Sequence, residues 1–262
     1  INYNGTQYKD GNMNESICLN PCSGIIMTYK GEPWYFFKDN ASIRGVNLNG
    51  NYLKTFLGKP DTPGYADGFT DQARLSGEYG QLAGWKNYIF LTEGKSNIIR
   101  QINIKNWEIK TIVGKYKKNG NIDFCNNLND CLIGIPSGIW IDPKADGNLI
   151  YFWDNVSGKC KKIDIKKNKL TTVFTGGGNT NSITGRYNDK GEKLLYFFNN
   201  SKGYQIKINE YNEKSGVINK IIGFSSNNLF VGDKDGKQDV VTIDYYNFTM
   251  KWYEDKKMLL FD

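Results

Sequence analysis

The chain has 262 residues, of which 39% are hydrophobic and 14% aromatic, so it is long enough to bury a large core. Its formal net charge of +7 comes from 30 Lys and only 4 Arg. Because base and phosphate recognition relies on Arg for bidentate contacts, this balance argues against nucleic acid as a partner. No stretch approaches the about 18 consecutive apolar residues of a membrane-spanning helix, so the sequence predicts no membrane span.

Short β-branched and aromatic runs, bounded by Gly, Asn, Asp and Pro, predict four strands in each of four successive units. The predicted strands cover residues 24–29, 34–38, 42–48 and 52–57 in the first unit, and 81–85, 88–91, 98–104 and 108–113 in the second. They cover 138–141, 149–153, 160–165 and 170–174 in the third, and 183–187, 194–198, 204–209 and 217–222 in the fourth. No segment with helical periodicity competes with these strands.

The same kind of loop opens several of these units. Asp10-Gly11 and Asp67-Gly68 lie 57 residues apart, and Asp235-Gly236 follows 168 residues later, which is three more periods of 56. A repeat of this size with four strands per unit is typical of a β-propeller. We therefore expect an all-β fold in one domain over 1–262, or the N-terminal part of one, with blades at about 8–58, 65–114, 120–176, 178–223 and 232–262.

The fifth blade is expected to be incomplete, because the chain ends after its second predicted strand. A half blade leaves unpaired backbone groups at its edge, which propellers normally avoid by closing on themselves. We therefore expect a second segment to complete a ring of six blades, or of five. Since Ile1 is not an initiator Met, we interpret the chain as a mature or excised segment.

The repeats resemble NHL repeats, in which a Gly-Asp-Gly loop leads through an aromatic strand ending in an acid to a strand carrying Ile-Arg and a terminal Gly. The second unit matches best, through Tyr65-Ala66-Asp67-Gly68, Ile98-Ile99-Arg100 and Thr111-Ile112-Val113-Gly114. The resemblance extends over nearly the whole chain. The abundance of Lys and Asn is also similar to that of secreted proteins from apicomplexan-type parasites.

Two acid and base pairs recur at one place in these repeats. Asp39 precedes Arg44, and Glu93 precedes Arg100, each pair spaced so that an acid at the end of one strand meets a base early in the next. We expect these four residues to form partly buried structural ion pairs that fix a turn.

Five cysteines bear on the compartment. Cys18 and Cys22 lie four apart, and Cys125 and Cys131 lie six apart, each pair in the loop that opens a unit. Two local disulfides, and thus an oxidising compartment, are expected, with free buried thiols and, after them, zinc as the rival interpretations. Cys160 is either buried in a strand or pairs with a part of the molecule outside this chain.

Six sequons suggest a secreted glycoprotein, at Asn4, Asn14, Asn40, Asn155, Asn199 and Asn247. Three of these, Asn40, Asn155 and Asn199, are predicted in turns after a second strand.

Catalytic groups are scarce. NHL-like propellers include lyases and lactonases that depend on His or on a metal held by His, and this sequence contains no His. Carboxylates recur in the opening loops, where they either bind Ca²⁺ or cap their own turns. The calcium candidates are Asp67, Asp71, Asp235 and Asp239, with Asp123 in an equivalent loop. No cofactor other than calcium is expected.

Two functional hypotheses remain. In the first, the chain is a non-catalytic propeller, secreted or displayed at a cell surface, that serves protein recognition or adhesion, with Trp34, Trp107 and Trp252 as possible anchors. In the second, it is a propeller hydrolase or lyase with a carboxylate or metal site in a central channel. The absence of His favours the first hypothesis.

Overall fold

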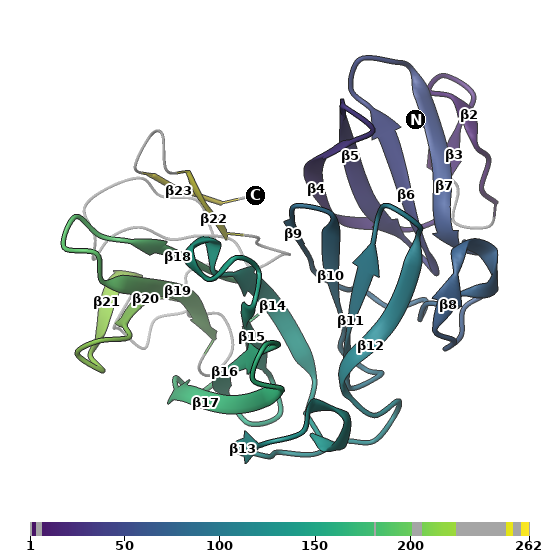
Figure 1. Ribbon diagram of the computed structural model, residues 1–262. Helices are drawn as coiled ribbons and strands as arrows, with labels where there is room; N and C mark the ends of the chain where they lie inside the picture. Colours follow the sequence, from purple (N-terminus) through teal and green to yellow (C-terminus); the bar gives the residue numbers. More distant parts are fainter. Residues whose placement is uncertain are drawn as a thin grey trace. The chain divides into compact units, whose positions relative to one another are not determined.

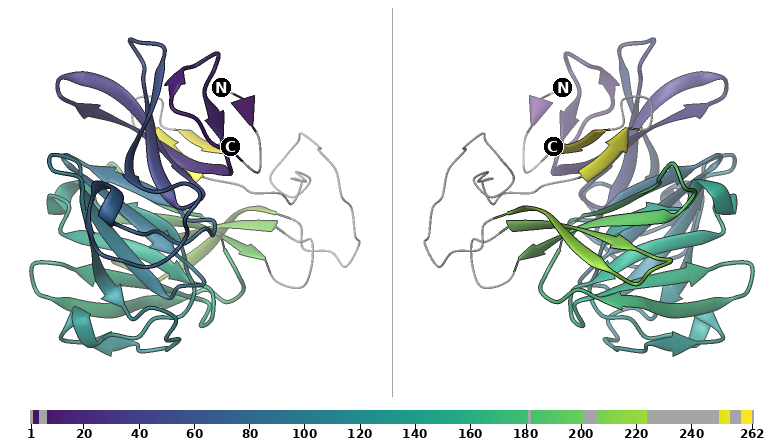
Figure 2. Two further views of the ribbon diagram at one scale, coloured as in Figure 1. Left: turned by 90° about the vertical axis from the view of Figure 1, so that its right-hand side faces the viewer. Right: turned by 90° about the vertical axis from the view of Figure 1, so that its left-hand side faces the viewer.

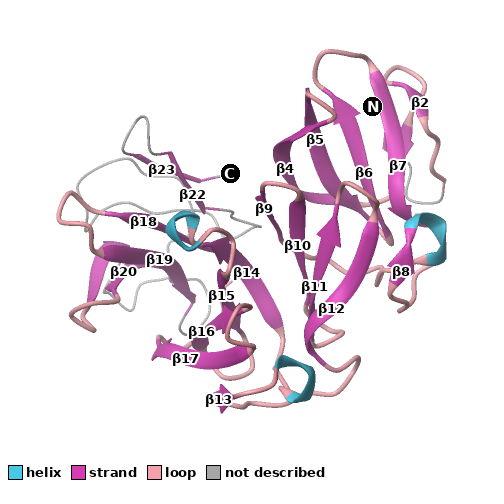
Figure 3. Ribbon diagram, viewed as in Figure 1, coloured by secondary structure: helices cyan, strands magenta, loops and turns pink. Residues whose placement is uncertain are grey.

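The computed structural model describes residues 2–3, 7–180, 182–200, 206–223, 250–253 and 258–261 (Figure 1). It confirms the all-β propeller fold, with four antiparallel sheets that each contain one complete blade. Among these residues, three short 3₁₀ helices interrupt the loops, η1 (Thr70–Gln72), η2 (Leu128–Asp130) and η3 (Pro143–Ala145) (Figure 3). The chain divides into two compact units, Ile1–Ile122 with Asn127–Pro136, and Asp123–Asn126 with Ser137–Asp262.

The first unit holds two blades. Blade 1 comprises β4 (Pro21–Tyr29), β5 (Glu32–Asp39), β6 (Ser42–Asn47) and β7 (Tyr52–Gly58), with β2 (Gly11–Asn12) added to its outer edge. Blade 2 comprises β9 (Leu82–Trp85), β10 (Tyr88–Glu93), β11 (Ile98–Asn103) and β12 (Glu108–Gly114), with β8 (Gly68–Phe69) at its outer edge. The two short strands β1 (Asn2–Tyr3) and β3 (Ile17–Cys18) pair in parallel.

The second unit holds the next two blades. Blade 3 comprises β14 (Pro136–Ile141), β15 (Leu149–Asp154), β16 (Lys159–Asp164) and β17 (Lys169–Thr175), with β13 (Phe124–Cys125) at its outer edge. Blade 4 comprises β18 (Ile183–Tyr187), β19 (Lys193–Asn200), β20 (Ile206–Asn212) and β21 (Ile218–Gly223). A hairpin of β22 (Met250–Tyr253) and β23 (Met258–Phe261) follows, drawn in yellow in Figure 2. Whether this hairpin begins an incomplete fifth blade stays a prediction.

Each blade carries a register shift at the same place in the pairing of its third strand with its fourth, where the fourth strand has one extra residue. The shifts fall between Ile43 and Arg44, between Ile99 and Arg100, between Cys160 and Lys161, and between Ile208 and Asn209. A bulge of this kind bends a strand and redirects one side chain. The polar residue after each shift is therefore structurally equivalent in the four blades.

Apolar side chains join the blades within each unit. In the first unit, Met27 and Phe36 of blade 1 share one buried cluster with Ile89, Ile102 and Ile109 of blade 2. In the second unit, the cluster combines residues of blades 3 and 4, which include Tyr151, Trp153, Phe174, Leu195 and Phe197. Burial of large aromatic side chains contributes most to such interfaces.

One of the two predicted disulfides is confirmed and the other is wrong. Cys125 and Cys131 form a disulfide. The predicted bridge between Cys18 and Cys22 is wrong, since both thiols are free. The Sγ atom of Cys18 lies 3.7 Å from Nη1 of Arg44, whereas that of Cys22 lies 3.9 Å from the carbonyl oxygen of Gly80. The two side chains thus face different neighbours, and close spacing in sequence does not bring their sulfur atoms together.

Two of the three free thiols, those of Cys18 and Cys160, are inert. Cys160 lies in β16 with none of its surface exposed, and its thiol is free. Burial raises the pKa of Cys160 well above its usual value, and burial, reinforced by Asp39, raises the pKa of Cys18 to about 11. Both side chains therefore stay protonated at neutral pH and act as small apolar groups.

We expect the variants Cys125→Ser and Cys131→Ser each to lose about 2 kcal/mol of unfolding free energy, the chain-entropy value for so short a loop. Urea unfolding with and without dithiothreitol measures this loss. The matched control is Cys22→Ser, which removes a free thiol and should keep the full response to dithiothreitol. An unchanged midpoint for Cys125→Ser would contradict a stabilising role for the bridge.

Candidate functional site

The predicted ion pair of blade 1 forms part of a larger charge cluster. Nη1 of Arg44 lies 2.7 Å from Oδ2 of Asp39, and both side chains are fully buried. Nη2 of Arg44 lies 2.7 Å from Oδ1 of Asp10, the loop aspartate. Asp10 in turn accepts hydrogen bonds from the backbone N and Oγ1 of Thr55 in β7. One guanidinium therefore ties the opening loop to the second and third strands of the blade.

Blade 2 repeats this cluster. Arg100 lies 3.4 Å from Glu93 and 2.8 Å from Asp67, and Asp67 accepts hydrogen bonds from the backbone N and Oγ1 of Thr111. The aspartate of the opening loop is thus engaged by Arg and Thr, which is a structural role. The pairing of Asp67 with Arg100 was not predicted from the sequence, although their 33-residue spacing nearly matches the 34 residues between Asp10 and Arg44.

In blade 3, two lysines form the ion pairs that a single arginine forms in blades 1 and 2. Lys161, fully buried, lies 2.8 Å from the buried carboxylate of Asp154. Asp123 of the loop instead binds Lys159 at 2.7 Å and accepts a hydrogen bond from Thr172. Hydrogen bonds from Lys159 and Thr172 hold the pKa of Asp123 below its usual value. Because an ammonium is a single point donor, one Lys does not span two carboxylates as Arg does.

Blade 4 carries no charge at these positions. Asn209 follows the register shift and is buried, with 8% of its surface exposed. Asn199 occupies the position in β19 that corresponds to the acid of the other blades. The charge cluster is therefore a feature of blades 1 to 3.

The carboxylates predicted to bind calcium do not form a cluster in the described part of the chain. Asp67 is bound by Arg100, and Asp71 of η1 accepts a hydrogen bond from Thr70. Asp235 and Asp239 lie outside the described residues. Across the part of the chain that the structure describes, no group of three or more His, Cys, Asp or Glu could hold a metal ion.

The sequons lie in different environments. Asn14 is exposed in a turn. The side-chain amide of Asn40 donates to the carbonyl oxygen of Pro60, and the side-chain oxygen of Asn155 accepts from the backbone N of Thr180. Asn199 lies inside β19 rather than in the predicted turn. Asn4 and Asn247 are outside the described residues.

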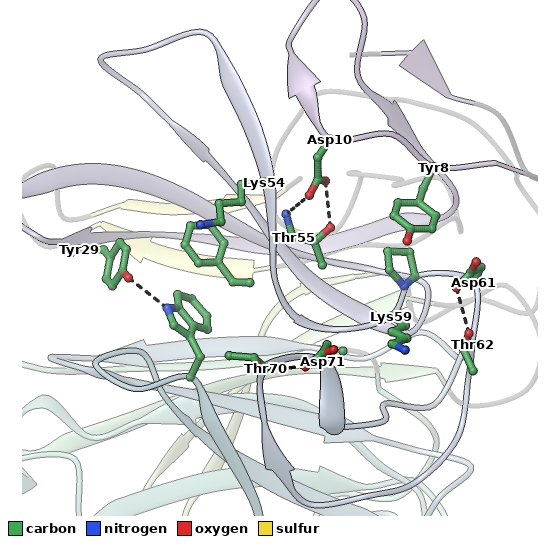
Figure 4. Close-up of a pocket in the computed structure, with 14 residues that line it drawn as sticks. Tyr8, Asp10, Tyr29, Lys54, Thr55, Lys59, Asp61, Thr62, Thr70 and Asp71 are labelled. Atoms are coloured by element: carbon green, nitrogen blue, oxygen red, sulfur yellow. Dashed lines mark hydrogen bonds between the residues drawn. The ribbon is translucent and has the colours of Figure 1, made fainter.

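A cleft of about 680 Å³ lies within the first unit, between β7 of blade 1 and the segment of blade 2 that contains η1 (Figure 4). Buried aromatic residues form one wall of the cleft. The rings of Phe56 and Trp107 lie 4.4 Å apart, and Nε1 of Trp107 donates to the hydroxyl of Tyr29 at 3.2 Å. These contacts lock the rings in place, so the wall is rigid.

Charged side chains stand around this aromatic wall. Lys54 lies over the ring of Phe56 at 5.4 Å, and Lys59, Asp61 and Asp71 also line the cleft. None of these four charges forms a salt bridge with another described residue. They are therefore available to charged groups of a ligand or partner. We call them the rim charges.

The predicted tryptophan anchors are mostly structural. Trp107 is 6% exposed and contributes to the cleft wall. Trp34 stacks on Phe36 in blade 1, with ring centroids 6.0 Å apart. The side chain of Trp252 lies outside the described residues.

A second polar centre joins blades 3 and 4 within the second unit. Nζ of Lys193 lies 2.8 Å from Asp142 and 2.8 Å from Glu213, and it donates to the hydroxyl of Tyr151. Lys162 reaches the other oxygen of Glu213 at 2.9 Å. The side chain of Lys193 is only 11% exposed, and that of Asp142 is 2% exposed. We call Lys193, Asp142, Glu213 and Tyr151 the Lys193 network.

The network perturbs the pKa values of its members. Burial alone would raise the pKa of Glu213, but hydrogen bonds from Lys193 and Lys162 outweigh it and hold that pKa below its usual value. Burial alone would lower the pKa of Lys193, yet its bonds to Asp142, Glu213 and Tyr151 raise it. Both groups are therefore charged at neutral pH. Burial also raises the pKa of Tyr151, so that its hydroxyl stays protonated.

The depressed pKa of Glu213 predicts an acid-dependent loss of stability. Its contribution is present above the unfolded pKa of about 4.3 and is lost as the pH falls through the lower folded pKa. We expect wild type to exceed Glu213→Gln in unfolding midpoint at pH 7, and the difference to shrink below about pH 4. Thermal unfolding of both proteins at pH 7, 5, 4 and 3 measures it, and parallel curves would contradict the prediction.

In the described part of the chain, no helix is long and apolar enough to cross a membrane. Neither family models nor curated proteins match this sequence.

The fold is similar to that of several solved structures. One is a chain in the crystal structure of a nidogen/laminin complex, 15% identical, with a TM-score of 0.55 over 87% of this chain and 69% of that one. Another is a putative TolB from Agrobacterium tumefaciens, 11% identical, with a TM-score of 0.50 over 92% and 79%. A third is an auxiliary nutrient binding protein from Bacteroides thetaiotaomicron, 10% identical, with a TM-score of 0.49 over 98% and 70%. At these identities the likeness concerns the fold alone.

Proposed function

We propose that this chain is a non-catalytic propeller, secreted or displayed at a cell surface, that recognises another protein. The observation that carries the proposal is the cleft of the first unit, in which four rim charges, none paired in a salt bridge with another described residue, surround a rigid aromatic wall. An apolar centre surrounded by a polar rim is characteristic of protein interfaces. We further propose that the repeats are of the NHL type, and that a second polypeptide segment completes the propeller.

Three further observations support this assignment. The chain contains no His, which is the commonest general base near neutral pH. The disulfide between Cys125 and Cys131 is typical of an oxidising compartment. A solved propeller with similar architecture comes from a complex of nidogen with laminin, that is, with another protein. The alternative of a hydrolase or lyase has no comparable support among the described side chains.

The test begins with the intact native molecule. We expect its native mass to exceed 29.8 kDa by the mass of a bound protein. Charge reversal at the rim, Lys54→Glu or Asp71→Lys, should weaken that binding at least about tenfold, the scale of a lost interfacial charge contact. The control is Lys166→Glu, at an exposed position of the second unit, which should bind as wild type does.

Two results would overturn the proposal. One is a native molecule with no protein bound, or one whose partner binds both rim variants as tightly as wild type. The other is turnover of p-nitrophenyl acetate or of a simple lactone that Asp71→Asn or Asp61→Asn abolishes.

A further inference from the structure

Blades 1 and 2 both have a tyrosine in the opening loop, two residues before the loop aspartate. These residues are Tyr8 and Tyr65. Cζ of Arg44 lies 5.8 Å from the ring centroid of Tyr8, and the corresponding distance between Arg100 and Tyr65 is 5.3 Å. Tyr8 is 38% exposed and Tyr65 is 39% exposed. The two tyrosines are therefore equivalent in position, in exposure and in the buried guanidinium that each ring contacts.

In blade 2, a second aromatic ring stacks on this tyrosine. The ring centroids of Tyr65 and Tyr116 lie 4.5 Å apart, and the ring planes are inclined by only 8°. Tyr116 stands two residues after Gly114, which ends β12 with a positive φ of 90°. Stacking of this kind stabilises a contact beyond the burial of apolar area alone. Blade 2 thus shows which side chain fits against the tyrosine of an opening loop.

Blade 1 has the same turn but lacks the second ring. Gly58 ends β7 with a positive φ of 79°. The turn after it is closed by a hydrogen bond of 3.1 Å from the backbone N of Thr62 to the carbonyl oxygen of Lys59, and the corresponding bond of blade 2 is 2.9 Å long. The residue at the position of Tyr116 is Pro60. In blade 1 a smaller, non-aromatic ring therefore replaces the tyrosine.

The cleft of the first unit lies at this place in blade 1. Tyr8 and Pro60 both line it, and its volume of about 680 Å³ is within the range of pockets that bind ligands. Among the described residues, no aromatic ring stacks on Tyr8. Residues 4–6, which precede Tyr8 and lie outside the described residues, are Asn, Gly and Thr. The chain next to Tyr8 thus supplies no ring for this position.

The next residue of the turn differs in charge between the two blades. In blade 2, Nζ of Lys117 lies 5.3 Å from the ring centroid of Tyr116. Blade 1 has Asp61 at the position of Lys117, and Asp61 forms no salt bridge with another described residue. Figure 4 shows Tyr8 and Asp61 toward one end of the cleft and Tyr29 toward the other. A ring that docks on Tyr8 therefore has an acid nearby, which favours a basic residue beside that ring.

We propose that the partner protein inserts an aromatic side chain into the cleft, where it stacks on Tyr8 as Tyr116 stacks on Tyr65. A Lys or Arg of the same segment pairs with Asp61. The inference rests on the proposed recognition of a protein at this cleft, and it specifies the chemistry of the segment that binds. Aromatic side chains are frequent anchors of protein interfaces, because they bury a large area at a small cost in conformational entropy.

The first experiment compares the two equivalent tyrosines, with the protein that copurifies with the native molecule as the probe. Tyr8→Ala should weaken its binding at least about tenfold, the effect of a lost aromatic contact. Tyr8→Phe keeps the ring and should bind as wild type does. The matched control is Tyr65→Ala, which removes a ring of the same exposure that Tyr116 already covers, and it should also bind normally. Normal binding by Tyr8→Ala would overturn the inference.

The second experiment identifies the residue that docks. Photoreactive p-benzoylphenylalanine replaces Thr62, which is exposed and lines the cleft, and the native complex is irradiated. We expect a cross-linked peptide from a different polypeptide, with Phe, Tyr or Trp within a few residues of Lys or Arg. A cross-link to another part of this chain, to a second copy, or to a peptide without an aromatic residue would contradict the inference.

The rim variants separate this inference from the proposed function. If Lys54→Glu weakens binding while Tyr8→Ala does not, the cleft binds its partner without an aromatic anchor, so the inference fails and the proposed function stands. If neither variant weakens binding, both are wrong. If only Tyr8→Ala weakens binding, the aromatic contact stands and the proposed role of the rim charges is rejected.

Discussion

Replacement of Lys193 by Met should lower the free energy of unfolding by about 3 to 5 kcal/mol, the usual cost of removing one partner from a buried ion pair. The ammonium of Lys193 neutralises both Asp142 and Glu213 at 2.8 Å, and Asp142 is almost fully buried. Without it, the Asp142 carboxylate keeps only polar contacts such as that from the hydroxyl of Tyr187. Urea unfolding of the purified chain, followed by Trp fluorescence, measures the loss.

The matched control is Lys214→Met in the same blade. Lys214 pairs with Glu192 at 3.1 Å, but its side chain is 75% exposed, so water replaces the lost contact. We expect its unfolding midpoint to equal that of wild type. Equal midpoints for both variants would show that the Lys193 network does not stabilise the interface between blades 3 and 4.

The strands and the short-range ion pairs could be predicted from the sequence. Asp39 precedes a two-residue turn and pairs with Ser42, and Arg44 lies two residues after Ser42, so the pleat places Asp39 and Arg44 on one face as diagonal neighbours. The propeller follows from the period of the repeat, because each unit of four strands has an apolar face that only a neighbouring blade can bury.

The Lys193 network could not be predicted in this way. Its members lie directly after β14, in β15, at the start of β19 and directly after β20, with separations of up to 71 residues between Asp142 and Glu213. No local pattern links them, because the packing of blade 4 on blade 3 brings them together. The cleft has the same origin, since Trp107 of blade 2 meets Tyr29 of blade 1 across 78 residues.

The incorrect prediction of a Cys18–Cys22 disulfide shows that close spacing in sequence does not by itself identify a disulfide. Cys18 and Cys22 are close in sequence, but Cys18 belongs to β3 and Cys22 to β4, and the backbone between them turns their side chains to separate neighbours. Cys125 and Cys131 are further apart in sequence, yet they are bonded. Side-chain direction rather than sequence distance decides whether two cysteines can pair.

The charge cluster of blade 1 leads to the second large prediction. Arg44 donates to Asp39, to Asp10 and to the carbonyl oxygens of Ile17 and Lys9, all within 2.9 Å. Arg44→Met leaves the fully buried Asp39 without its counter-charge and should cost about 3 to 5 kcal/mol of unfolding free energy. Arg44→Lys keeps the charge, so we expect a smaller loss of about 1 to 3 kcal/mol, since one ammonium cannot reach both acids.

Urea unfolding of a double-mutant cycle with Asp39→Asn tests the assignment, because the cycle isolates the interaction between the two side chains. Lys9→Met serves as the control: it removes an ion pair with Glu15 whose side chains are 55% and 64% exposed, and its midpoint should not move. An interaction energy below about 0.5 kcal/mol in the cycle, the limit of additivity for independent sites, would mean that the pair does not stabilise the blade. A loss for Arg44→Lys as large as that for Arg44→Met would indicate that the forked geometry, rather than the charge, holds the opening loop to the blade.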